Sequence, residues 1–187
     1  MNDKANIRNK LKEKRIKLSR EYIANESKKI ITQLITSPLI AKANNIAGYF
    51  PANNEVDTKE LKIWCWKNNK NYYLPVLRNQ SLMFSKYLPS TLMVKNKFKI
   101  PEPQNTNVIY ANKLEIIIIP LVGTDIKGNR IGMGAGFYDR TLAFKSKCPL
   151  LIGLAYDFQV VDFLTPEEFD IPLNYVVTPN KIIICEE

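Results

Sequence analysis

The chain contains 187 residues, of which 45% are hydrophobic, and it carries a formal net charge of +9. This length and composition predict one globular domain with a substantial buried core. The sequence contains no histidine, which excludes a Ser-His-Asp triad and a histidine-ligated zinc site, so any chemistry must use carboxylates, Lys, Arg, Tyr, Cys, backbone amides or an oxygen-ligated metal such as Mg²⁺.

The positive charge is concentrated at the N-terminus. Residues 1–20 contain eight basic and two acidic side chains, so they account for +6 of the total and the other 167 residues for +3. This distribution predicts one basic helix rather than the broad basic surface of a nucleic-acid-binding protein, which remains an alternative. There is no apolar run of the ~18 residues that a membrane span needs, and the Lys-rich start lacks the apolar core of a secretory signal. With three scattered cysteines, these features predict a cytoplasmic protein with no membrane partner.

The first elements are expected to be two helices and a strand. Residues 3–18 have the apolar spacing of an amphipathic helix, with lysines on its other side. Ser19 suits the N-cap of a second helix, which must end before Pro38. A short strand is predicted over residues 45–50.

A helix and a hairpin are expected next. Asp57 followed three residues later by Glu60 has the spacing of a capping box at the start of a helix. Strands at residues 72–77 and 82–88 are joined by a short turn and form the hairpin. Residues 89–113 contain prolines and little periodicity, so they are expected to be mostly loop.

The strongest predicted strand covers residues 114–122, where an unbroken apolar run from Ile116 indicates burial on both faces of a parallel sheet. After it we expect a helix at about 136–145, a strand at 150–155, a short helix opened by Thr165-Pro166-Glu167-Glu168, and strands at 175–178 and 181–185. This order predicts an α/β domain with three α/β/α layers and a Rossmann-like, mostly parallel sheet with a hairpin extension.

The segment after the strongest strand has alternating glycines. Residues 128–140 read GNRIGMGAGFYDR, with glycine at 132, 134 and 136. The P-loop pattern fails because Asn129-Arg130 stand where Lys and Ser/Thr are required. The dinucleotide pattern fails because Phe137 replaces the third glycine, which disfavours a nicotinamide dehydrogenase. The glycines either form a plain tight turn or let backbone N–H groups point at an anion, with Arg130 beside them.

Five charged residues stand out, and each has an ordinary structural interpretation. Asp139 either stabilises the following helix by ~0.3–1 kcal/mol through its dipole or binds Mg²⁺ beside a phosphate. Arg130 is either a surface-turn residue or a phosphate-binding cation. Lys4 and Arg8 share one helix face and would ordinarily be solvated. Glu55 would ordinarily be an acid in a loop.

Six segments, taken in chain order, carry a family resemblance. They are Lys4 with Arg8, EVDT at 55–58, IPEP at 100–103, the glycine segment at 128–140, GLAYDFQ at 153–159 and DIPLN at 170–174. Together they resemble the 5-formyltetrahydrofolate cyclo-ligase family, also called methenyltetrahydrofolate synthetase. The similarity covers nearly the whole chain, and the glycine segment is its most specific part.

The resemblance implies a single domain over residues 1–187, with a basic helix at about 3–18 that closes over the nucleotide site. It implies that ATP and 5-formyltetrahydrofolate yield 5,10-methenyltetrahydrofolate, ADP and phosphate, with Mg²⁺. The formyl oxygen attacks the γ-phosphate, and N10 then displaces phosphate. Such transfer needs positioning and charge neutralisation more than a general base, which suits a chain without histidine. The expected partners of the monomer are ATP and a reduced folate, including polyglutamylated forms, and no nucleic acid.

Matching positions imply roles residue by residue. ATP binding is implied for Lys4, Arg8, Arg130, Gly132, Gly134, Gly136 and Tyr138, with Arg130 and Tyr138 catalytic. Folate binding is implied for Phe50, Glu55, Met133, Gly134, Ala135, Gly136 and Phe137, with Glu55 hydrogen-bonding the pterin. Metal binding is implied for Asp139 and Asn174. The family often has Asp at the second of these positions, and an amide coordinates more weakly, so a catalytically silent nucleotide- or folate-binding protein is an alternative.

Overall fold

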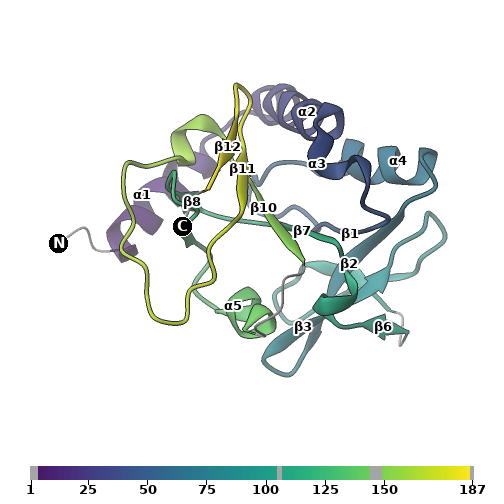
Figure 1. The fold of residues 1–187 in the computed structure, drawn as a ribbon. Coiled ribbons are helices and arrows are strands. Elements are labelled where there is room, and N and C mark those ends of the chain that lie inside the picture. The colour runs from purple at the N-terminus through teal and green to yellow at the C-terminus, as the bar shows by residue number, and fades with distance from the viewer. Residues whose placement is uncertain (1–3, 105–106, 144–148, 186–187) are drawn as a thin grey trace.

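An eight-stranded mixed sheet runs through the molecule in the order β12-β11-β10-β7-β1-β2-β3-β6 (Figure 1). The computed structural model describes residues 4–104, 107–143 and 149–185. The strands are β1 (Asn45–Ala47), β2 (Asn71–Arg78), β3 (Ser81–Lys86), β6 (Val108–Ile109), β7 (Ile116–Ile119), β10 (Leu150–Leu154), β11 (Tyr175–Val177) and β12 (Ile182–Ile184). Strands β11, β10, β7, β1 and β2 are parallel neighbours, and β12, β3 and β6 pair antiparallel. The expected mostly parallel sheet with a hairpin extension is confirmed.

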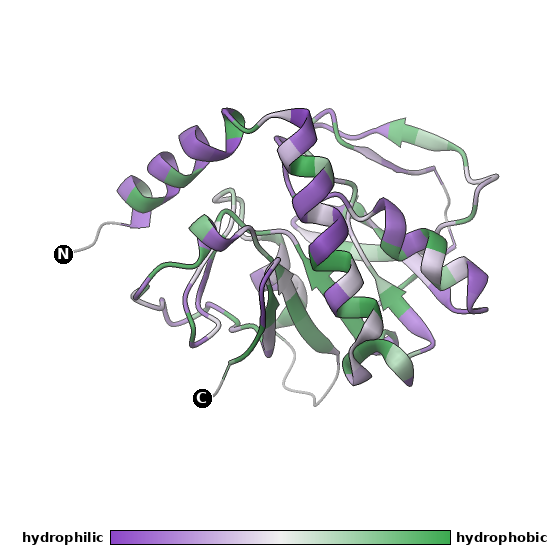
Figure 2. Ribbon diagram, turned by 90° about the horizontal axis from the view of Figure 1, so that it is seen from above, coloured by the Kyte–Doolittle hydropathy of each residue, from purple (hydrophilic) through white to green (hydrophobic). Residues whose placement is uncertain are grey.

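Helices cover both faces of this sheet (Figure 1). Helices α2 (Arg20–Thr36), α3 (Pro38–Ala41) and α4 (Lys59–Lys67) lie on one face, and α5 (Phe137–Leu142) lies on the other. The four isoleucines of β7 alternate between two apolar clusters: Ile116 and Ile118 pack with α2 and α4, whereas Ile117 and Ile119 pack with Leu142 of α5. The three-layer α/β/α prediction is confirmed, because the strand is buried from both sides. Figure 2 shows these apolar strands beneath more polar helices.

Helix α1 (Lys4–Ile16) packs outside the two main clusters, against the short hairpin of β8 (Gly123–Thr124) and β9 (Arg130–Ile131). Its Leu11 shares a small apolar cluster with Val122, Ile131 and Leu164. A Cβ at Gly123 would come within 2.4 Å of the Leu11 Cδ1 atom, so glycine permits this close approach. Ser19 caps α2 as expected, its hydroxyl accepting from the Tyr22 N–H at 3.1 Å. Among the described residues, no helix is long and apolar enough to cross a membrane.

The segment expected to be mostly loop, residues 89–113, contains regular structure. Strands β4 (Met93–Lys95) and β5 (Pro101–Pro103) form a separate antiparallel pair, and β6 and a 3-10 helix, η1 (Ala111–Lys113), follow. More than half of the described residues of this segment lie outside these short elements, as expected, and the strands form despite Pro101 and Pro103 because edge strands tolerate proline. A second 3-10 helix, η2 (Asp157–Gln159), follows β10.

Two local helix signals were wrong. The helix expected from Thr165 is absent, and Glu167 instead enters a turn in which its N–H donates to the Asp170 carboxylate at 2.9 Å. Tertiary contacts of Asp170 therefore override the local pattern. The capping box before α4 does not form either, because Thr58 is the N-cap residue and its hydroxyl donates to the Tyr49 carbonyl. Asp57 bonds instead to the Lys59 N–H at 2.8 Å.

Candidate active-site cleft

A cleft of about 860 Å³ opens where the loops after β1 and β7 meet the glycine segment and the β4–β5 hairpin. Sites at the carboxyl ends of parallel strands are typical of α/β proteins, and this volume is typical of a small-molecule site. All but one of the sequence-predicted site residues line it: Lys4, Arg8, Phe50, Glu55, Arg130, Gly132, Met133, Gly134, Ala135, Gly136, Phe137, Tyr138 and Asp139. The fold thus brings together residues from both ends of the chain.

The glycine loop presents open backbone to this cleft. Gly134 and Gly136 have φ angles of 97° and 64°, which favour glycine. A Cβ added at Gly132 or Gly134 would meet nothing within 4 Å. Arg140 supports the loop from behind by donating to the Ala135 carbonyl at 2.6 Å. Small residues here therefore leave space that a ligand can occupy.

We expect Gly134→Ala to impair the loop more than Gly132→Ala. Both substitutions place the new methyl group in open space, but only Gly134 has a positive φ. The alanine at 134 must shift the loop or cost about 1–2 kcal/mol of backbone strain. The KM for ATP and the melting temperature of both variants measure this difference. Equal effects would mean that the side-chain volume, and not the backbone conformation, matters.

Arg130 and Asp139 form an ion pair at the floor of the cleft. The Arg130 Nη2 atom lies 2.5 Å from Asp139 Oδ1, and Nη1 donates to the Ile171 carbonyl. The Arg130 side chain is only 5% exposed, whereas that of Asp139 is 29% exposed. Strand β9 therefore holds a buried cation beside the first turn of α5.

The N-terminal end of α1 adds two more cations. The Lys4 Nζ atom lies 2.5 Å from Asp170 Oδ2 and 3.3 Å from Glu167 Oε1. The Arg8 Nε atom donates to the Gly132 carbonyl at 3.0 Å. Burial raises the pKa of Asp170, but the Lys4 hydrogen bond, the Glu167 N–H and the nearby charges outweigh it and lower that pKa overall. Helix α1 is therefore anchored along the glycine loop.

Glu55 lies on the opposite side of the cleft in a tightly bonded loop. Its Oε2 atom accepts the Ala52 N–H at 2.9 Å, and its side chain is 11% exposed. Burial raises the pKa of Glu55, while the Ala52 hydrogen bond and the Arg15 charge oppose that rise. The Tyr49 hydroxyl donates to the Val56 carbonyl at 2.9 Å, which fixes the loop.

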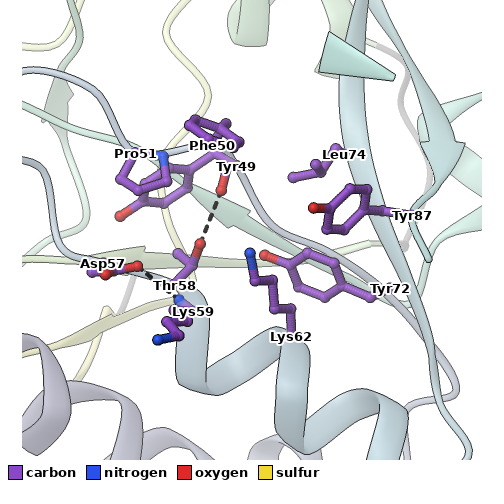
Figure 3. A pocket seen from close by; sticks show the side chains of 10 residues that line it. All are labelled: Tyr49, Phe50, Pro51, Asp57, Thr58, Lys59, Lys62, Tyr72, Leu74 and Tyr87. Atoms are coloured by element: carbon purple, nitrogen blue, oxygen red, sulfur yellow. Dashed lines mark hydrogen bonds between the residues drawn. The ribbon is translucent and has the colours of Figure 1, made fainter. Parts of the chain in front are cut away.

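A second cavity of about 220 Å³ lies behind this loop (Figure 3). It shares Tyr49, Phe50 and Pro51 with the cleft. Figure 3 shows the Thr58 hydroxyl directed at the Tyr49 carbonyl, a hydrogen bond of 2.9 Å. The N-terminus of α4 thus supports the segment that carries Phe50 into the cleft.

Tyr138 lies between the two charged sides. Burial raises its pKa, and the Glu55 carboxylate raises it further, while Arg130 lowers it. The phenol is therefore neutral near pH 7 and can donate a hydrogen bond.

Sequence reasoning missed several residues of the cleft region. Phe98 lies on the β4–β5 hairpin, and its ring meets Phe137 edge-on with centroids 5.7 Å apart. The acidic partners of Lys4 were not predicted, and neither was Arg15. A signal existed for Arg15, because positions 4, 8, 11 and 15 of α1 follow one helical stripe, and that stripe faces the protein.

Asn174 lies outside the lining of the cleft. Its Oδ1 atom accepts the Leu151 N–H at 2.8 Å, at the start of β10. The metal role predicted for Asn174 gains no support from this position.

The carboxylate of Asp139 suits a metal ion that is also bound by the phosphates of a nucleotide. Within the described ranges, no three His, Cys, Asp or Glu side chains gather as a complete metal site. Mg²⁺ ordinarily binds one or two carboxylates together with substrate phosphates. Asp139 fits this requirement, because it lines the cleft and its hydrogen bonds to the described residues, from Arg130 and the Ile171 N–H, use Oδ1 alone.

The fold and the cleft together define an α/β protein in which an open glycine loop lies beside a buried arginine, in a cleft large enough for small molecules. A family model described as the 5-formyltetrahydrofolate cyclo-ligase family matches residues 1–179. The chain belongs to this family. It therefore has 5-formyltetrahydrofolate cyclo-ligase activity and is an ATP-dependent ligase of folate one-carbon metabolism.

Individual relatives agree with the family model. The 5-formyltetrahydrofolate cyclo-ligase of Haemophilus influenzae is 48% identical over 138 residues, which are 71% of this chain and 74% of that protein. The enzyme of the same name from Escherichia coli K12 is 37% identical over 181 residues, or 92% and 98% of the two chains. The NMR structure of Aquifex aeolicus 5,10-methenyltetrahydrofolate synthetase matches with a TM-score of 0.87 and 31% identity, covering 98% of this chain and 93% of that one.

Proposed function

We propose that the cleft binds ATP and 5-formyltetrahydrofolate together and transfers the γ-phosphate to the formyl oxygen. This proposal rests on the observation that the cleft has two different sides. One side carries cations, and the other carries a carboxylate and an aromatic ring. Arg130, Lys4 and Arg8 supply the cations. Glu55 and Phe50 lie on the other side, and the glycine loop joins the two.

The cationic side is assigned to the ATP phosphates. Arg130 is buried and rigid, so it can offset the charge that develops on the transferred phosphoryl group. Lys4 and Arg8 contact the same phosphates from α1. The glycines at 132, 134 and 136 have no side chains, so the phosphates can approach the backbone of the loop. The neutral Tyr138 hydroxyl donates to a phosphoryl oxygen. The basic helix thus serves the cleft, which disfavours the nucleic-acid alternative.

The aromatic side is assigned to the folate. A pterin presents an amide N–H and an exocyclic amine, and a carboxylate such as Glu55 accepts from both. Phe50 packs on the ring, and residues 133–137 line the space between folate and nucleotide. Phe137 is stacked from behind by Arg140, whose guanidinium carbon lies 5.3 Å from the ring centroid.

In the proposed chemistry, phosphorylation turns the formyl oxygen from a poor leaving group into a good one. The formyl oxygen attacks the γ-phosphorus, the bond to ADP breaks, and an imidoyl phosphate forms. N10 then attacks the formyl carbon, loses its proton, and phosphate leaves with the former formyl oxygen. Arg130 and Tyr138 hold the phosphoryl oxygens in both steps, and closure of the cleft excludes water.

We propose that Asp139 would hold Mg²⁺ together with the ATP phosphates. When bound, it would neutralise phosphate charge and help orient the γ-phosphate. We further propose that the protein acts as a monomeric single domain in the cytoplasm, where its scattered thiols stay reduced; Cys65 and Cys185 are free.

Oxygen-18 in the formyl group of the substrate tests this route. Transfer of the γ-phosphate to the formyl oxygen predicts that the label appears in the released inorganic phosphate. Mass spectrometry of the phosphate, with the methenyl product followed by its near-ultraviolet absorbance, gives the answer. Unlabelled phosphate at full product yield would contradict phosphorylation of the formyl oxygen, while leaving the cyclo-ligase activity itself intact.

A further inference from the structure

Arg15 is a buried cation near the end of α1. Its side chain is 1% exposed, although it belongs to a helix that is otherwise largely solvated. The Nη1 atom donates to the Leu121 carbonyl at 2.8 Å, just after β7. The Nε atom is buried without a hydrogen-bond partner among the described residues. A guanidinium that is only partly satisfied in a buried site is costly, and this cost requires an explanation.

The compensating charge is Glu55. The Arg15 Nη2 atom lies 3.8 Å from Glu55 Oε1, close enough for strong attraction and too far for a hydrogen bond. Replacing a buried ion pair by apolar side chains is often neutral or stabilising. Stability alone therefore explains Arg15 poorly, and a functional role for the pair explains it better.

The geometry leaves one carboxylate oxygen of Glu55 available. Its Oε2 atom is engaged by the Ala52 N–H at 2.9 Å. No hydrogen bond from the described part of the chain reaches Oε1, which faces Arg15. Arg15 thus supplies charge to Oε1 without occupying its lone pairs.

The backbone around the pair is fixed. The Asn54 side-chain amide donates to the Arg15 carbonyl at 3.1 Å, so the end of α1 and the Glu55 loop are joined. The Arg15 Nη2 atom also lies 3.9 Å from the Met133 sulfur on the glycine loop. One side chain therefore touches both sides of the proposed folate site.

We propose that Arg15 is a positioning residue that keeps the Glu55 carboxylate ionised and directed at the donor groups of the pterin. This inference rests on the proposed role of Glu55 in folate binding and deepens it. Three titratable groups face Glu55: Arg15 from α1, Tyr49 after β1 and Tyr138 from α5. Burial raises the pKa of both tyrosines, so Arg15 is the member of this set that is charged at neutral pH.

The pH dependence of folate binding tests the proposal. Burial already raises the pKa of Glu55, and removal of the Arg15 charge raises it further. Arg15→Gln removes the charge and leaves a shorter, polar side chain in its place. Its KM for 5-formyltetrahydrofolate should therefore be about tenfold higher at about pH 6 than at about pH 8.5. The wild type should vary much less, and kcat at saturating folate and the KM for ATP should change little.

Two further variants separate the possible causes. In a Glu55→Gln background no carboxylate titrates, so adding Arg15→Gln should leave the KM independent of pH. Arg15→Lys retains the charge and should restore most of the wild-type profile. A pH-independent KM in Arg15→Gln, or a Lys variant that behaves like the Gln variant, would overturn the positioning role. A Glu55→Gln enzyme with normal folate KM would instead overturn the proposed role of Glu55 itself.

A direct measurement covers the case in which Arg15→Gln fails to fold. Carbon-13 NMR of the wild-type enzyme, with the Glu55 carboxyl signal assigned by its loss in Glu55→Gln, reports the protonation state. A carboxyl that is ionised at neutral pH agrees with the proposal, whereas one that is still protonated at neutral pH would refute it.

Discussion

Replacement of Arg130 by alanine is expected to lower kcat/KM roughly 10²- to 10³-fold, which corresponds to about 3–4 kcal/mol of transition-state stabilisation. Arg130 is a buried cation at the floor of the cleft, and its orientation is fixed by Asp139 and by the Ile171 carbonyl. A preorganised charge in a poorly solvated site stabilises a developing phosphoryl charge strongly, because no water has to reorganise. The loss should appear mainly in kcat.

Arg20→Ala is the matched control, because it removes an exposed arginine from the start of α2. It should leave kcat/KM unchanged. Melting temperatures of both variants show whether the Arg130 effect comes from unfolding. A folded Arg130→Ala enzyme with near-normal kcat/KM would rule out the assignment of Arg130 to the phosphoryl group.

Asp139→Asn is expected to raise the Mg²⁺ concentration needed for half-maximal activity by at least about tenfold. Asparagine has nearly the same shape and keeps an oxygen that can accept from Arg130, so the variant removes charge with little change in packing. Excess Mg²⁺ should restore much of the rate, because the ATP phosphates still supply ligands. A Mg²⁺ titration at saturating ATP and folate gives the result.

Asp162→Asn serves as the comparison, since Asp162 is exposed and lies outside the cleft. It should leave the Mg²⁺ dependence unchanged. An Asp139→Asn enzyme that has lost activity at every Mg²⁺ concentration, or one with a normal requirement, would count against a metal ligand at this position. The first result would point to the ion pair with Arg130 as the main role of Asp139.

The sheet could be predicted because its signals are local. The isoleucine run of β7 is apolar on both faces, and that pattern admits burial only between two layers. Ser19 caps α2 by a hydrogen bond within one turn, so neighbouring residues specified it. Where distant residues competed, local signals failed: the Thr165 pattern lost to the turn held by Asp170, and Asp170 is held by Lys4.

The same difference between local and long-range signals applies to the residues of the candidate site. The spacing in residues 128–140 and the family resemblance placed the glycine-loop part of the cleft, from Arg130 to Asp139. No local pattern distinguished Asn174, whose amide is used by Leu151, from a metal ligand. Arg15 was passed over because a basic residue in a Lys-rich helix is ordinarily solvated.

The sequence by itself determined the chemistry available to this protein: no imidazole, a glycine loop beside Arg130 and Asp139, and a parallel α/β core. Only the tertiary structure decided which charges meet. Lys4 joins Asp170 across 166 residues, and Arg8 joins Gly132 across 124. Arg15 faces Glu55 inside the protein. The physical reason is that burial and charge pairing depend on distances between elements, and periodicity along the chain does not contain those distances.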